Sequence, residues 1–404
     1  MENEKKPAVR FKEFTDDWKV LKFGDVFVER RDKSVIENED TLLSCAISGM
    51  FLNSELFSHQ RGQSNIGYIK VKKGDLILSA QNLHLGNANV NLRFNHGIIS
   101  PAYKVYEPVN CDPNFAQAWI KRDKAKKYFL SATTEGASAC RKNVVWEWLY
   151  NQPFYLPPIS EQKEIGQSFF YLDRFITLHQ RKCDNLQNMK KACLEKMFPQ
   201  NGSKVPKIRF RGFHGVWNQT MISDVVTFSK GNGYSKSDLR PNGTPIILYG
   251  RLYTKYQFAI NCVDTFAKMK TGSILSNGNE VIVPASGETA EDIARAAAVE
   301  RADIILGGDL NILHPSREIL PQFLALSISN GSPKKELARK AQGKSVVHIH
   351  NSDIEEISVL YPKLSEQRKI VEVFRNIDNL IDLQQQELEK LQNIKKSLLE
   401  KMFV

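Results

Sequence analysis

The sequence lacks several patterns that would assign it to a common class. It has no run of 18 apolar residues, and its start, MENEKKPAVR, contains no apolar core of a secretion signal. Its six cysteines, at positions 45, 111, 140, 183, 193 and 262, include no CxxC pair. Scattered cysteines are typical of reduced thiols rather than of a zinc site or a disulfide framework. We therefore expect a soluble, cytoplasmic protein without membrane contact.

Catalytic signatures are also missing. The stretch AQGKSVV (Ala341–Val347) contains the GKS of a phosphate loop, but Ala338 stands where the leading glycine belongs. His348 and His350 form an H-x-H pattern with no third ligand nearby in sequence. No glycine-rich methyl-donor motif and no Asn/Asp-Pro-Pro-Tyr/Phe tetrapeptide occurs. We therefore predict no catalytic residues, no metal site and no enzymatic activity for this chain.

What the sequence does have is positive charge and length. Lysine and arginine number 56 against 45 aspartates and glutamates, which gives a net charge of +11 and a pI near 9.2. This balance suits a polyanionic partner such as double-stranded DNA. With 404 residues, 42% of them hydrophobic, the chain can form two or three domains with substantial cores.

An internal repeat determines the expected architecture. At a shift of 205 residues, Ser160–Phe198 falls on Ser365–Phe403, and 19 of the 39 positions are identical, including SEQ at the start and LEKMF at the end. At a shift of 199, PAVRFKEFTDDW (Pro7–Trp18) resembles PKIRFRGFHGVW (Pro206–Trp217). Two similar blocks in the same order indicate a duplicated unit. The stretches between these blocks are hardly alike.

Each repeated tail reads as one long helix. Prolines precede Ser160 and Ser365, which are candidate N-caps. Apolar residues follow at alternating spacings of four and three, as in a coiled-coil seam. Each helix would be roughly 58 Å long. The residues expected to pair the helices are Phe169, Ile176, His179, Leu186, Phe374, Ile381, Gln384 and Leu391.

Two arrangements fit such helices. Each could pack as an amphipathic helix on its own domain. The alternative, which we favour, pairs the two helices around a pseudo-twofold axis, so that they are antiparallel. His179 and Gln384 are the midpoints of their tails, and in this arrangement the two polar residues would meet.

The dissimilar middles are rich in β-type runs separated by Gly, Asn and Asp, so each reads as an α+β domain. KKGDLILSAQN (Lys72–Asn82) and NGNEVIVPASGE (Asn277–Glu288) occupy corresponding places. Loops at strand ends combine cations, amides and aromatic residues, whose donors and rings suit bases. The candidate DNA-binding residues are Arg61, Gln81, Asn82, His84, Asn87, Lys230, Asn232, Tyr234, Tyr249, Arg251, Tyr253 and Ser286. Any one of them could instead belong to an ordinary solvated loop.

Two variable domains, each followed by a PPISEQ or PKLSEQ helix that ends in LEKMF, resemble the specificity subunit of type I restriction-modification systems. The resemblance covers nearly the whole chain. It implies a non-catalytic DNA reader whose two target recognition domains each read half of a split site. It also implies helices that space the domains and dock two methyltransferase subunits, and a motor-nuclease subunit in the same complex. S-adenosylmethionine, ATP and magnesium would then belong to the partner subunits, with no cofactor on this chain.

The expected fold is therefore α+β, with two α/β target recognition domains separated by two long antiparallel coiled-coil helices in a pseudo-twofold repeat. The expected segments are 1–18 (N-terminal segment), 19–155 (first recognition domain), 156–200 (central helix), 201–217 (linker and repeated motif), 218–358 (second recognition domain) and 359–404 (C-terminal helix). Polar residues repeated outside the seam are candidate partner contacts: Gln162, Gln187, Asn188, Gln367, Gln392 and Asn393. The alternative function is a stand-alone DNA-binding or nuclease-associated scaffold without a methyltransferase partner.

Overall fold

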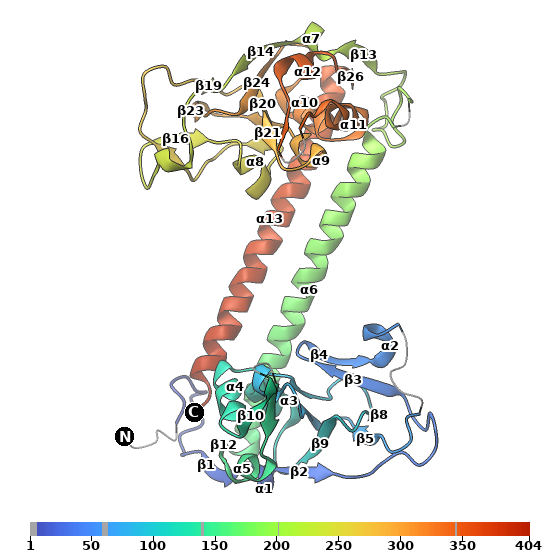
Figure 1. Cartoon of the computed structure of the whole chain (residues 1–404), viewed down its shortest axis with the longest axis vertical. Helices are drawn as coiled ribbons and strands as arrows, with labels where there is room; N and C mark the ends of the chain where they lie inside the picture. The colour runs from blue at the N-terminus through green and yellow to red at the C-terminus, as the bar shows by residue number, and fades with distance from the viewer. Residues whose placement is uncertain (1–5, 59–63, 139–140, 201, 344–345) are drawn as a thin grey trace. The chain divides into compact units, whose positions relative to one another are not determined.

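The computed structural model describes residues 6–58, 64–138, 141–200, 202–343 and 346–404. The chain divides into two compact units: Met1–Arg181 together with Gln384–Val404, and the continuous segment Lys182–Leu383. The long helices α6 (Ile159–Met197) and α13 (Leu364–Lys401) each begin in one unit and end in the other (Figure 1). Each unit therefore contains one α+β domain, the start of one long helix and the end of the other.

The α+β domain of the first unit contains two four-stranded sheets, ordered β2–β9–β6–β7 and β4–β3–β8–β5. Among the described strands of these two sheets, only β3 and β8 pair in parallel. The strands are β2 (Phe27–Arg30), β3 (Leu42–Ala46), β4 (Gly49–Leu52), β5 (Ile69–Lys72), β6 (Leu76–Ser79), β7 (Ala88–Val90), β8 (His96–Ile99) and β9 (Tyr103–Pro108). Outside these sheets, β1 (Lys19–Lys22) pairs with β12 (Pro153–Leu156), and β10 (Thr133–Ser138) pairs with β11 (Arg141–Val144). The helices are α1 (Phe23–Val26), α2 (Asn53–Leu56), the 3-10 helix η1 (Leu83–Leu85), α3 (Pro113–Ile120), α4 (Asp123–Leu130) and α5 (Trp146–Asn151).

The domain of the second unit has two five-stranded sheets, ordered β14–β24–β20–β22–β17 and β15–β18–β16–β23–β19. Their strands are β14 (Val226–Lys230), β15 (Leu239–Arg240), β16 (Thr244–Ile247), β17 (Ala259–Ile260), β18 (Phe266–Ala267), β19 (Leu275–Asn277), β20 (Glu280–Pro284), β22 (Ala297–Val299), β23 (Ala302–Leu306) and β24 (Leu310–Pro315). Two further pairs join β13 (Asn218–Met221) to β26 (Ser358–Tyr361), and β21 (Ser286–Gly287) to β25 (Val347–His348). The helices are α7 (Ile222–Val225), η2 (Lys236–Asp238), α8 (Arg251–Thr254), α9 (Ala290–Ile293), α10 (Pro321–Ile328), α11 (Gly331–Lys340) and α12 (Asn351–Glu355).

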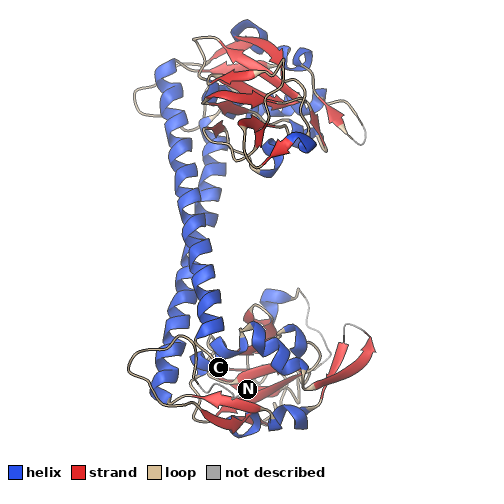
Figure 2. Cartoon of the chain, turned by 90° about the vertical axis from the view of Figure 1, so that its left-hand side faces the viewer, coloured by secondary structure: helices blue, strands red, loops and turns tan. Residues whose placement is uncertain are grey.

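The two domains share one topology although their sequences differ. The order β14–β24–β20–β22 repeats β2–β9–β6–β7, and in both domains a proline-started helix of eight residues, α3 or α10, follows the last of these strands in sequence. The buried strands β6 and β20 are the cores of KKGDLILSAQN and NGNEVIVPASGE. Figure 2 shows the sheets and helices of each domain together. The prediction of a duplicated α+β unit is thus confirmed.

A buried ion pair explains the short repeated motif before each domain. Arg10 donates through Nε and Nη2 to the carboxylate of Glu161, both at 2.7 Å. Arg209 contacts Glu366 in the same way, at 2.7 and 2.8 Å. Both glutamates are almost completely buried at the start of a long helix. An arginine fork satisfies both carboxylate oxygens, which a buried acid requires. The arginine of RF and the glutamate of SEQ are therefore repeated together.

Aromatic packing explains the repeated LEKMF. The Phe403 ring lies 5.4 Å from Phe115, 5.9 Å from Phe169 and 6.3 Å from Trp18, between ring centroids. In the second unit, the equivalent Phe198 lies 5.6 Å from Phe323 and 6.1 Å from Trp217 and Phe374. Each pentapeptide thus ends a long helix inside the core of an α+β domain.

The two helices are antiparallel within each unit, as predicted. In the first unit, Phe169 near the start of α6 contacts Phe403 after the end of α13. Lys395 also bonds Asp173 there, and the equivalent pair in the second unit, Lys190 with Asp378, lies at 2.5 Å. These ion pairs account for the lysines that interrupt the apolar seam in both copies. Both helices begin one residue earlier than predicted, so the SEQ serines are inside the helices.

The predicted meeting of His179 and Gln384 at the helix midpoints stays a prediction. Among the described residues, His179 Nδ1 and Gln384 Oε1 are buried without a hydrogen-bond partner. Of the other predicted pairing residues, Phe169, Phe374 and Ile381 are buried, and Ile176, Leu186 and Leu391 are half-buried.

Replacing either aromatic helix end should destabilise a specific unit. Phe403→Ala should cost about 3–5 kcal/mol of unfolding free energy, since it leaves a cavity in a well-packed core. Amide hydrogen exchange should then accelerate in β6, whereas Phe198→Ala should accelerate it in β20. Phe170→Ala is the matched control, because this ring is 43% exposed. Faster exchange in the opposite strands would contradict the packing described.

Candidate nucleic-acid interface

The connection from β6 to β7 presents amide side chains on a well-defined loop. Gln81 and Asn82 are exposed directly after the buried strand, and η1 follows with Leu83 fully buried as its anchor. Gly86 has a φ of +88°, a conformation that favours glycine and lets the chain turn back. The backbone N–H of Asn87 then donates to the backbone carbonyl of Asn82 at 3.2 Å and closes the loop. The side-chain amides of Gln81 and Asn82 are therefore held in place at the surface.

A basic helix lies beside this loop. Helix α4 packs against η1, and its Lys124, Lys126 and Lys127 are exposed. The side chain of Lys126 passes close to Gly86, where an added Cβ would lie 3.3 Å from its Cε. Lys126 also pairs with Asp123 at 3.1 Å. Cations therefore border exposed amides, an arrangement suited to phosphates beside base edges.

The second domain has a counterpart. The connection from β20 to β22 contains β21 and α9, and the basic helix α11 packs against α9. Two of its cations, Lys335 and Arg339, are exposed. Tyr253 donates its hydroxyl to the carbonyl of Ser286 at 2.8 Å, and Tyr249 lies edge-on to Tyr253 at 6.3 Å. Three of the predicted residues are thus brought together beside a basic helix.

The other predicted residues of the second domain form a separate group around the end of β14. Lys230 is exposed, and Asn232 donates to the carbonyl of Gly272 at 3.1 Å. Tyr234 bonds Ser273, and the Lys270 ammonium lies 4.6 Å from the centre of its ring. The amide of Asn232 and the hydroxyl of Tyr234 therefore already have intramolecular partners.

The three remaining predicted DNA-binding residues of the first domain differ in their surroundings. His84 is half-buried within η1, next to the exposed amides. Asn87 is 9% exposed, and its side chain lies 3.5 Å from the Cys45 thiol in the interior. The side chain of Asn87 is therefore a structural group, because a loop that must close on itself turns this residue inward. Arg61 lies outside the described residues.

Arg251 is also a structural residue, contrary to the prediction that it reads bases. Its side chain is 8% exposed and donates to Asp264 at 2.7 Å, to Gln257 at 3.2 Å and to the Cys262 carbonyl at 3.1 Å. Hydrogen bonds from Lys255 and Arg251 lower the pKa of Asp264 to about 2, so the acid is ionised at neutral pH. The guanidinium therefore holds the segment after α8 together.

The prediction of Gln162 and Gln367 as surface contacts is wrong. Both are almost completely buried. Gln162 accepts a bond from the amide of Asp112 at 2.8 Å and donates to the Pro157 carbonyl at 2.8 Å. Gln367 bonds Leu320 and Pro362 in the same manner, also at 2.8 Å. Repetition of these residues reflects a repeated internal bond, which sequence repetition alone does not distinguish from a repeated surface.

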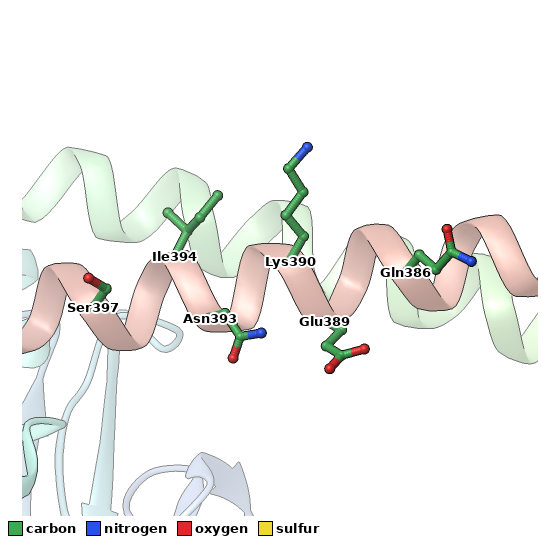
Figure 3. A pocket seen from close by; sticks show the side chains of 6 residues that line it. All are labelled: Gln386, Glu389, Lys390, Asn393, Ile394 and Ser397. Atoms are coloured by element: carbon green, nitrogen blue, oxygen red, sulfur yellow. The ribbon is translucent and has the colours of Figure 1, made fainter. Parts of the chain in front are cut away.

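The remaining partner candidates, Gln187, Asn188, Gln392 and Asn393, are exposed on the long helices. Asn393 lines a shallow hollow along α13, whose side chains extend to both sides of a single helix (Figure 3). Such an open surface suits contact with a protein better than enclosure of a small ligand.

The lysines of α4 and the basic residues of α11 were missed from the sequence. The available signal was positional. DKAKKY (Asp123–Tyr128) and PKKELARK (Pro333–Lys340) both follow the helix that each domain buries in its core. Within the described part of the chain, no group of three or more His, Cys, Asp or Glu could hold a metal ion. No described helix is long and apolar enough to cross a membrane.

Comparison with known proteins identifies the family. The type I restriction modification DNA specificity domain matches residues 15–188 and again residues 215–393. The chain belongs to this family. It is a type I specificity subunit with two target recognition domains, one in each matched range.

Relatives and solved structures agree with this assignment. The MjaVIII specificity subunit of Methanocaldococcus jannaschii is 22% identical over 95% of this chain and 91% of its own length. The putative MjaX specificity subunit of the same organism is 21% identical over 87% and 77%. The S subunit of a type I restriction-modification system from M. genitalium has a TM-score of 0.60 at 12% identity, with 99% of each chain covered. A chain from a study of the assembly and conformational transition of the type I R-M system has a TM-score of 0.51 at 16% identity, over 96% of this chain and 97% of its own. The two structural likenesses show the fold.

Substitution of Arg251 should separate stability from recognition. Arg251→Ala should lower the unfolding free energy of the second domain by about 1–3 kcal/mol, because charged hydrogen bonds are removed. Tyr249→Ala, at an exposed ring of the same segment, should leave thermal unfolding unchanged. An Arg251→Ala protein that unfolds like wild type would show that the guanidinium is not a structural group.

Proposed function

We propose that each recognition domain reads one half of a bipartite DNA target through the connection that follows its central strand. The observation that supports this most is the repeated juxtaposition of that connection with a basic helix: β6–β7 with α4, and β20–β22 with α11. The two connections carry different side chains on the same topology, as two readers of different sequences require.

The residues divide by chemistry into two roles. Exposed cations of α4 and α11 bind phosphates, which gives affinity without sequence preference and a steep dependence on salt. Gln81 and Asn82 have exposed amides that can donate to and accept from a base edge at the same time. In the second domain, the exposed Tyr249 presents a ring at the corresponding place, and the Ser286 hydroxyl lies 3.2 Å from His348 Nδ1.

Catalysis is assigned to partner subunits. In this proposal the chain binds no cofactor, S-adenosylmethionine is bound by the methyltransferase subunits, and ATP and magnesium are bound by the motor-nuclease subunits. The long helices space the two domains and dock the methyltransferase subunits. The continuity of α6 and α13 across both units supports the spacing role.

A repeated apolar surface supports docking. Outside the seam, α6 exposes Phe175 and Leu178, and α13 exposes Leu380 and Leu383 at the positions 205 residues later. Eleven residues further along each helix, about three turns, Met189 and Ile394 are exposed at equivalent places as well. Large side chains that are 40–57% exposed at matching positions are typical of an interface. Because the surface occurs once in each unit, two copies of one partner fit it.

The two roles of the reading surface can be measured separately. Changing Lys124, Lys126 and Lys127 to Gln should weaken binding on all sequences and lower the salt slope by about 1 for each phosphate that is no longer bound. Gln81→Ala should instead relax discrimination by about 1–3 kcal/mol at the first half-site only. The assay is selection from random duplexes by the complex with its methyltransferase. Equal loss at both half-sites for Gln81→Ala would contradict the assignment.

Partner docking predicts a stoichiometry. Leu178→Glu and Leu383→Glu should each remove one of two methyltransferase copies, and the double variant should remove both, because a charge opposes burial of the apolar surface. Native mass spectrometry counts the copies. Thr177→Glu is the matched control, since Thr177 is exposed on another side of the same helical turn. Two copies retained in both single variants would place docking elsewhere.

A further inference from the structure

In each domain, one core helix, α3 or α10, lies between the start of a long helix and the connection proposed to read DNA, β6–β7 or β20–β22. The start of α3 is held by Gln162, which accepts from the amide of the N-cap residue Asp112. The start of α10 is held by Gln367, which accepts from the amide of the N-cap residue Leu320. The two helices then pack against β7 and β22, the strands that follow the reading connections. The contacts at the C-terminal ends of α3 and α10 therefore also affect where these connections lie.

The end of α3 ties two loops together. Lys121, the C-cap, donates from Nζ to the carbonyl of Ile47 at 2.8 Å and to that of Ala88 at 3.1 Å. Ile47 is in the β3–β4 turn, where its side chain is 57% exposed, and Ala88 directly follows the reading connection. Burial lowers the pKa of Lys121 to about 8, and most of its side chain is hidden. One ammonium group thus fixes the distance between two surface loops.

The end of α10 does the same with different chemistry. Ser329, the C-cap, is 8% exposed; its Oγ accepts from the amide of Ala296 at 2.9 Å and lies 3.2 Å from the Ala296 carbonyl. The hydroxyl of Tyr256 lies 3.1 Å from Ser329 Oγ. The Tyr256 hydroxyl also lies 3.2 Å from the Ala296 carbonyl, so Tyr256 and Ser329 together bond the backbone of Ala296. Ala296 ends the β20–β22 connection, and Tyr256 ends the segment that begins with Tyr249.

We propose that Lys121 in the first domain, and Ser329 with Tyr256 in the second, are positioning residues that hold two reading loops of each domain at a fixed separation without contacting DNA. This inference rests on the proposed function. It extends the reading surface of the first domain to the β3–β4 turn, where the exposed Ile47 suits an apolar contact such as a thymine methyl group.

The physical reason is geometric. A hydrogen bond to a base weakens steeply when its distance or angle changes, so discrimination depends on how firmly the loops are held. Phosphate contacts by flexible lysines tolerate such changes. Loss of the hydrogen bonds made by Lys121, or by Ser329 and Tyr256, should therefore reduce discrimination between sequences more than it reduces overall affinity.

The test compares three serine variants in the full chain, assembled with its methyltransferase and selected on random duplexes. Ser329→Ala should reduce discrimination against single-base changes in the second half-site about five- to tenfold, with the first half-site unchanged. Ser329→Thr retains the hydroxyl and should restore discrimination. Ser327→Ala is the matched control, because this buried serine is on the same helix and its Oγ has no hydrogen-bond partner among the described residues.

Two further variants decide the outcome if Ser329→Ala does not fold. Tyr256→Phe should affect the second half-site, and Lys121→Met should affect the first half-site alone. Unchanged discrimination in folded variants, or an equal loss of affinity on every sequence, would overturn the positioning role. A wild-type complex that prefers no half-site at all would instead refute the proposed function.

Discussion

The packing of a phenylalanine at the end of each long helix into an aromatic core is the interaction on which the other features depend. Phe403 and Phe198 each join a tryptophan of the short repeated motif and a phenylalanine of the core helix. Because each unit is completed by a helix end from a distant part of the sequence, both halves of the repeat are needed for either core. The core helices α3 and α10 pack against these rings through Phe115 and Phe323.

A constant frame and variable loops are joined by short chains of hydrogen bonds. The frame consists of the Arg–Glu pair, the buried glutamine of SEQ and the aromatic helix end, which are repeated with nearly the same distances in both units. The loops differ in sequence and in the residues that anchor them, Lys121 in one domain and Ser329 in the other. This division lets recognition residues change while the scaffold that positions them stays the same.

The sequence predicts the frame well, because repetition and periodicity report packing directly. The seam, the two helices, the duplicated α+β units and the family follow from it. The sequence does not show whether a repeated polar residue lies inside or outside, as Gln162 and Gln367 illustrate, since a buried bond and a surface contact are repeated equally. Nor does it show that Arg251 is bonded to Asp264, 13 residues away. These depend on tertiary partners.

The central claim is that two independent readers are mounted on one repeated frame, and a domain exchange tests it most directly. Residues 218–358 would be replaced by a second copy of residues 19–155. This exchange keeps Trp18 and Trp217 of the two repeated motifs and both long helices that begin with SEQ. The target of the assembled complex would then be selected from random duplexes. The account predicts a target in which a further copy of the first half-site replaces the second. A folded exchange protein that still selects the original second half-site would contradict it.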